Sequence, residues 1–116
     1  IDPKGTTLEE IYDTRGNLSH STTLDSSGRL LANKELFYDA SNNLVRVHEY
    51  AIQDGKKLKM IITRFCYKDG HLTEIHEAAG TPEEKITRYE YNSFGQKKSA
   101  TFSDGTILRY RYDGIG

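Results

Sequence analysis

Two histidines recur at the same place in a repeating pattern, and each is followed by a glutamate. His48, in "VHEY" (47–50), and His76, in "IHEA" (75–78), each lie four residues after a leucine. Imidazole and carboxylate groups are zinc ligands, so the pattern raises the question of a His/Glu metal site. Equivalent positions in successive two-strand repeats lie roughly 10 Å apart, however, and adjacent residues of a strand point to opposite faces. We therefore expect surface histidines and no metal ligands.

The other reactive side chains also give no sign of catalysis. Cys66, in "RFCYK", is the only cysteine and has no Cys/His partner pattern, so we expect an inert, buried or half-buried thiol. Recurring turn aspartates offer one or two oxygens each, whereas calcium takes about six to eight. No phosphate-binding loop or nucleophile elbow occurs. We predict no catalytic residues, no cofactor and no enzyme activity.

Tyrosine pairs form a candidate binding face near the end of the chain. The sequence has eight tyrosines and no tryptophan. Tyr89 and Tyr91 share one strand face, as do Tyr110 and Tyr112, while arginines occupy the opposite face. Such a face could hold a protein or a glycan. The alternative is that these rings form the packed face of a sheet through cross-strand aromatic pairs.

These residues belong to a repeated signature, Tyr-Asp-x-x-Gly-x-Leu, whose copies begin 21 to 29 residues apart. The clearest copy is "YDTRGNL" (12–18), and a later copy, "YDASNNL" (38–44), replaces glycine with asparagine, which also tolerates a left-handed backbone. The signature residues are Tyr12, Asp13, Gly16, Leu18, Tyr38, Asp39, Leu44, Tyr67, Gly70, Leu72, Tyr91, Gly95, Tyr112, Asp113 and Gly116.

A second turn signal, Asp, Ser or Ala before Gly, falls about half-way between the copies. The runs between turns are rich in β-branched and aromatic residues, and several alternate with a period of two, as in "KITRYEY" (85–91) and "TILRYRY" (106–112). "AAGTPEEK" (78–85) is broken by glycine and proline and predicts a longer hairpin loop. The expected fold is all-β: an antiparallel meander of about nine strands in a strongly twisted or curled sheet, with one packed face.

The signature and its regular spacing resemble the RHS or YD repeats of bacterial Rhs polymorphic toxins, wall-associated proteins, toxin-complex shells and, distantly, teneurins. The resemblance covers about residues 8–116. It implies that residues 1–116 form a single YD-repeat β domain from a longer array. In that family the hairpins build a hollow β-shell, which in the toxins encloses a C-terminal effector domain.

Two functions follow as expectations. The first is a non-catalytic part of a secreted or surface-displayed bacterial shell, whose partners are further YD repeats or an enclosed effector domain of the same parent chain. The second is a self-contained β-sheet module that binds a protein or glycan. Sixteen basic and seventeen acidic residues give no bulk field, and no long apolar run occurs, so we expect neither nucleic-acid binding nor membrane insertion.

Overall fold

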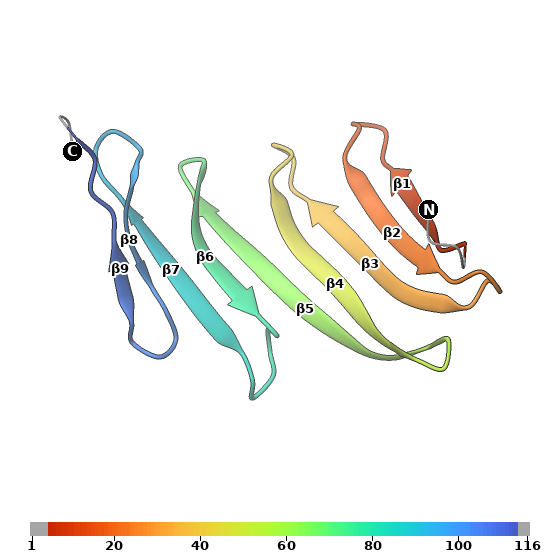
Figure 1. Cartoon of the computed structure of the whole chain (residues 1–116). Coiled ribbons are helices and arrows are strands. Elements are labelled where there is room, and N and C mark those ends of the chain that lie inside the picture. The colour runs from red at the N-terminus through yellow and green to blue at the C-terminus, as the bar shows by residue number, and fades with distance from the viewer. Residues whose placement is uncertain (1–4, 114–116) are drawn as a thin grey trace. The chain divides into compact units, whose positions relative to one another are not determined.

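The computed structural model describes residues 5–113, so the expected signature glycine Gly116 lies outside the described residues. Nine strands follow one another as a single antiparallel meander, and their order in the sheet is their order in the chain (Figure 1). The strands are β1 (Thr7–Tyr12), β2 (Leu18–Leu24), β3 (Leu30–Tyr38), β4 (Leu44–Gln53), β5 (Lys56–Lys68), β6 (His71–Glu77), β7 (Lys85–Tyr91), β8 (Lys97–Thr101) and β9 (Ile107–Arg109). The predicted all-β meander is confirmed.

The chain divides into two compact units whose boundary falls within β5. The N-terminal unit (Ile1–Ile62) holds β1 to β4 and the beginning of β5. The C-terminal unit (Thr63–Gly116) holds the rest of β5 and β6 to β9.

The signature residues build the turns through one hydrogen-bond pattern. Asp13 donates its N–H to the carbonyl of Asn17 (2.8 Å), and its own carbonyl accepts the N–H of Gly16 (3.0 Å). The Asp13 carboxylate also accepts the N–H groups of Arg15 (2.8 Å) and Asn17 (3.0 Å). Gly16 has a φ of +85°, which completes a three-residue hairpin loop with a bulge. Aspartate and glycine thus recur because this turn needs an acceptor at its start and a left-handed residue near its end.

Other copies follow the same rule with substitutions. The turns that begin at Asp39 and Asn92 have the same backbone and side-chain bonds. Asn42 takes the left-handed position with a φ of +66°, as its replacement of glycine predicted. The shorter copy closes on two left-handed residues, Asp69 (+54°) and Gly70 (+79°), which is typical of a two-residue hairpin turn.

A shift in strand register accompanies four of the repeat tyrosines. These shifts fall at Ile11/Tyr12, Phe37/Tyr38, Cys66/Tyr67 and Glu90/Tyr91. Each shift leaves one extra residue on the partner strand, so the alternation of faces changes relative to an unbroken hairpin. The bulge therefore decides which side chains meet across the strands.

The loop after β6 agrees with the sequence prediction, whereas the last strand is shorter than predicted. The predicted longer loop is confirmed, because β6 ends at Glu77 and β7 begins at Lys85. The predicted last strand, 106–112, is too long: β9 covers only Ile107–Arg109. Beyond β9, Tyr110 still donates its N–H to the carbonyl of Lys98 (3.1 Å), so the chain stays beside β8 without regular strand geometry.

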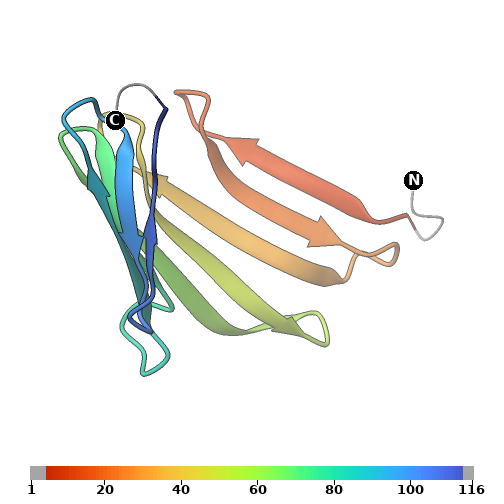
Figure 2. The ribbon, with the colours of Figure 1, turned by 60° about the vertical axis from the view of Figure 1, so that its left-hand side comes forward.

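Burial is sparse because each unit is one layer of strands. Figure 2 shows β1 to β4 of the N-terminal unit lying side by side in such a layer. Within residues 5–113, the only side chains buried to the level of a core belong to Val47 (8% exposed), Ser99 (8%) and Ala100 (0%). The packed face that the sequence predicts is thus reduced to small patches. No helix in the described part of the chain is long and apolar enough to cross a membrane.

Candidate functional site

Repeat tyrosines join successive copies of the signature through their hydroxyl groups. The tyrosine that begins one copy donates to the backbone carbonyl of the residue that ends the preceding copy. Each accepting residue is also the strand partner of the tyrosine that begins its own copy. These inter-repeat tyrosine bonds are Tyr38 to Leu18 (2.9 Å), Tyr91 to Leu72 (2.5 Å) and Tyr112 to Lys97 (2.8 Å).

The first repeat tyrosine differs from those three. Tyr12 is 56% exposed, and its hydroxyl donates to the side chain of Glu10 (3.0 Å). That hydrogen bond and the nearby negative charge raise the pKa of Tyr12. Tyr12 therefore occupies the signature position with a local, solvent-exposed bond.

The tyrosines predicted as a binding face are all half-buried. Tyr89 lies beneath the ammonium group of Lys97, 4.3 Å from the ring centre. Tyr91 stacks on His71 with 4.7 Å between the ring centres. The hydroxyls of Tyr91 and Tyr112 are engaged in inter-repeat bonds. Two of the four thus have a structural role, and ligand binding by this face stays a prediction.

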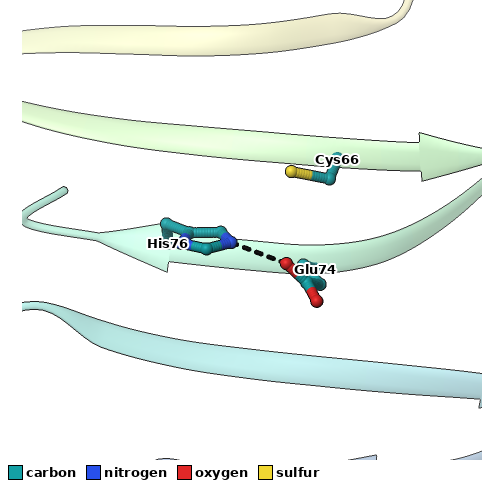
Figure 3. A group of neighbouring side chains, drawn as sticks. All are labelled: Cys66, Glu74 and His76. Carbon is teal, nitrogen blue, oxygen red and sulfur yellow. Dashed lines mark hydrogen bonds and ion pairs between the residues drawn. The ribbon is translucent and has the colours of Figure 1, made fainter.

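A second group of side chains, which the sequence did not assemble, lies on β5 and β6. Cys66 and Glu74 are direct partners in the β5–β6 ladder, and His76 follows Glu74 by two residues on the same face of β6. One donor atom from each of the three lies within 4.8 Å of the others. Figure 3 shows the sulfur of Cys66 on one strand beside the Glu74–His76 pair on the next. We call Cys66, Glu74 and His76 the β5–β6 cluster.

Neighbouring residues hold the outer atoms of this cluster. Nε2 of His76 lies 2.7 Å from Oε1 of Glu74, while its Nδ1 lies 3.2 Å from Oε2 of Glu84. Arg88, the partner of Glu74 on β7, donates its Nε–H to Oε2 of Glu74 (3.1 Å). The hydrogen bond from His76, and then that from Arg88, lower the pKa of Glu74. The side chain of His76 is 15% exposed and that of Glu74 is 32% exposed.

The sequence pattern did not predict this cluster, because the glutamate that directly follows His76 is Glu77, which belongs to the other face of the strand. The relevant carboxylate is Glu74, two residues earlier, and the thiol comes from the partner strand. A Glu-x-His pair within an alternating run was the available signal, because such spacing places both groups on one face.

The N-terminal unit contains a related group around Glu35. This carboxylate faces His20 on β2 (3.6 Å) and His48 on β4 (3.8 Å), and accepts the hydroxyl of Tyr50 (2.7 Å). The bond from Tyr50 is the main cause of its lowered pKa. The His48 ring packs against Phe37, and its Nε2 is buried with no hydrogen-bond partner among the described residues. His48 (14% exposed) and His76 (15% exposed) are thus both packed side chains and not the surface histidines that we expected.

The C-terminal unit also has a depression of about 590 Å³ on the face that carries Glu74. Its lining includes the opposite charges of Arg88, Glu90 and Arg109, together with the buried Ser99. Ser99 Oγ donates to Glu90 (3.2 Å). Charged and hydroxyl groups at this density suit a polar ligand more than an apolar one.

Comparison with known proteins adds no assignment. The sequence matches no protein-family model, and no curated protein is significantly similar to it.

Proposed function

We infer that this chain is a non-catalytic segment of a longer YD-repeat β-scaffold. The observation that carries the proposal is the set of inter-repeat tyrosine bonds. In each, a hydroxyl from one copy satisfies a carbonyl at the bulge of the preceding copy. A copy built in this way gains a partner from the next copy, as expected of repeat arrays stabilised by nearest-neighbour interfaces.

The outermost strands support the same conclusion. Strands β1 and β9 lie at the two ends of the strand order. Both expose large apolar side chains: Leu8 and Ile11 are each 59% exposed, and Ile107 and Leu108 are 49% and 46% exposed. A further repeat at either end would extend the antiparallel pairing of the sheet and pack side chains beside these exposed ones.

The wider role rests on the resemblance to YD repeats. A secreted or surface-displayed bacterial shell, with further repeats and an enclosed toxin or effector domain as its partners, is the assembly to which such a segment belongs. The sheet would act as a wall that keeps the enclosed domain apart from the cell that makes it.

The mass of the native protein tests the scaffold proposal. An antibody raised against this chain is applied to denaturing blots of cells and culture medium of the organism that encodes it. We expect a band several times heavier than the 13.2 kDa chain, present on the cell surface or in the medium. A single intracellular band near 13.2 kDa would overturn both the scaffold and its location.

The depression in the C-terminal unit favours a second candidate, a small binding module for a protein or glycan. Arg88 and Arg109 supply hydrogen-bond donors, and Glu90 supplies an acceptor, in one concave region. An array of neutral and acidic oligosaccharides tests the glycan form of this proposal. Binding should be lost in Arg109→Ala and kept in Arg46→Ala, which removes an arginine of the N-terminal unit. Equal binding by both variants would exclude the depression as the glycan site.

A further inference from the structure

The β5–β6 cluster brings three different donor types together. Cys66 offers a sulfur, Glu74 an oxygen and His76 a nitrogen, with one donor atom of each within 4.8 Å of the others. Zinc bonds of about 2.0–2.3 Å place the ligand atoms on one ion roughly 3–4 Å apart. Side-chain rotation is enough to close that difference, because all three groups already occupy one face of a two-strand ladder (Figure 3).

The outer atoms of two donors are already held in the manner of a metal site. Glu84 holds Nδ1 of His76, and Arg88 holds Oε2 of Glu74, which leaves Nε2 and Oε1 directed toward each other. Metal-binding histidines commonly donate their second N–H to a carboxylate, which fixes the ring and raises its basicity. Glu84 is itself positioned by the loop, where its N–H donates to the carbonyl of Thr81 (3.1 Å).

The donor set selects the ion. A thiolate and an imidazole disfavour calcium and magnesium, which prefer oxygen ligands, and favour zinc or a chemically similar divalent ion. Three protein ligands leave a fourth tetrahedral position for water. We propose that Cys66, Glu74 and His76 bind one Zn²⁺ ion, with Glu84 and Arg88 as positioning residues. This proposal does not depend on the scaffold function.

Binding has a defined proton balance. Zinc binds a deprotonated thiol and the lone pair of an imidazole nitrogen, so the Cys66 thiol releases its proton to solvent and Nε2 of His76 exchanges its contact with Glu74 for the metal. The charged groups around the ion are Glu84, Arg88 and Arg64, which lies opposite His76 in the β5–β6 ladder. The two arginines offset part of the negative charge and make the site moderate in affinity.

Cobalt(II) and the single cysteine provide the test. The full chain, freed of metal and kept reduced with a phosphine, is titrated with CoCl₂ and then with ZnCl₂. We expect a thiolate-to-cobalt charge-transfer band and tetrahedral cobalt absorption at one equivalent, both removed by zinc. Because Cys66 is the only thiol, zinc should also slow its reaction with Ellman's reagent in the unaltered protein, once the phosphine, which itself reduces that reagent, has been removed. No band and no protection would overturn the proposal and leave a metal-free ion-pair network.

Variants separate the site from adventitious binding. Cys66→Ser should abolish the charge-transfer band. His76→Gln should weaken zinc binding more than about 100-fold, which is a larger loss than removal of a residue that only positions a ligand causes. Glu84→Gln should weaken it by about 10-fold. His48→Gln, which alters the corresponding histidine, and Glu77→Gln, on the other face of β6, should bind as the parent does. Zinc binding that survives both Cys66→Ser and His76→Gln would show an adventitious site only. Circular dichroism confirms that each variant is folded.

Discussion

The β3–β4 and β5–β6 hairpins place different chemistry on one backbone frame. In both, a bulge at the repeat tyrosine sets the pairing, so Phe37 faces Arg46 in the first and Cys66 faces Glu74 in the second. Two residues further on, Glu35 faces His48 in the first, and Arg64 faces His76 in the second. The histidine keeps its place, while the carboxylate moves from the partner strand to the histidine's own strand.

That exchange decides what each histidine does. In the N-terminal unit one carboxylate, Glu35, lies between His20 and His48 and is capped by Tyr50. In the C-terminal unit one histidine lies between two carboxylates, and a thiol replaces Phe37. The repeat fixes where side chains meet, and a few substitutions decide whether the result is a packed polar group or a set of metal donors.

Transferring the cluster to the N-terminal unit should have the largest effect. The triple variant Glu35→Arg, Phe37→Cys and Arg46→Glu places the donors of the β5–β6 cluster around His48. Because the two hairpins share one register, we expect a second zinc equivalent, measured by calorimetry. Its affinity should be about 10-fold weaker, since no counterpart of Glu84 is present.

The double variant Glu35→Arg and Phe37→Cys is the matched control for that transfer. It adds the thiol, removes the carboxylate that lies 3.8 Å from His48, and keeps Arg46 in the place of the new carboxylate, so the zinc stoichiometry should stay at one. A triple variant that folds but gains no zinc would contradict the idea that the shared register is sufficient.

Removing a repeat hydroxyl should lower stability in either unit. Tyr38→Phe and Tyr91→Phe each leave a carbonyl without its inter-repeat partner, and each should cost about 1 kcal/mol of unfolding free energy. Urea denaturation followed by circular dichroism measures the change. Tyr12→Phe is the control, because its hydroxyl bonds only an exposed side chain, and it should alter stability far less. Equal losses in all three variants would contradict the role of these bonds.

The turns that follow β4 and β6 differ in how well they suit a left-handed backbone. Ala78 has a φ of +54°, where a β-carbon is unfavourable, so Ala78→Gly should stabilise the protein by about 0.5 kcal/mol. Asp54 has a φ of +52°, but aspartate tolerates this region, so Asp54→Gly should change little. Thermal unfolding of both variants gives the comparison. A loss of stability in Ala78→Gly would show that the strain is offset elsewhere.

Lowering the pH should destabilise both units through their carboxylates, and we expect this to be the smallest of the effects considered. The pKa values of Glu35 and Glu74 are lowered from 4.5, so the stability they contribute is present above that pH. It is lost as the pH falls through their lowered values. Tyr50→Phe should make the unfolding free energy depend less on pH in this range, because the hydrogen bond from Tyr50 is the main cause of the lowered pKa of Glu35. Urea unfolding at several pH values below about 5 measures this slope. An unchanged slope would assign the acid dependence to other carboxylates, such as Asp25 and Asp39.

The sequence predicted the fold well because its turns are local. Asp13 and Gly16 act within one loop, so their types and spacing are enough to place a hairpin. The β5–β6 cluster depends on a long-range detail. An unbroken hairpin around Asp69 and Gly70 would place Cys66 opposite Thr73, on the face away from Glu74.

The bulge at Cys66/Tyr67 makes Thr73 the extra residue and moves Glu74 opposite the thiol. Thr73 then donates its hydroxyl to the carbonyl of Cys66 (3.1 Å), which stabilises the shifted register. The residue types alone do not predict that shift in register. A sequence pattern therefore located the strands but not the partners across them.

The inter-repeat tyrosine bonds leave the two ends of each hairpin unequal. At one end, the signature turns are joined to the neighbouring copy by these bonds. At the other end, the connections already vary from two residues at Asp54–Gly55 to the long segment between Glu77 and Lys85. The connections at that second end can therefore accept inserted peptides, so foreign loops could be displayed there without disturbing the register of the strands.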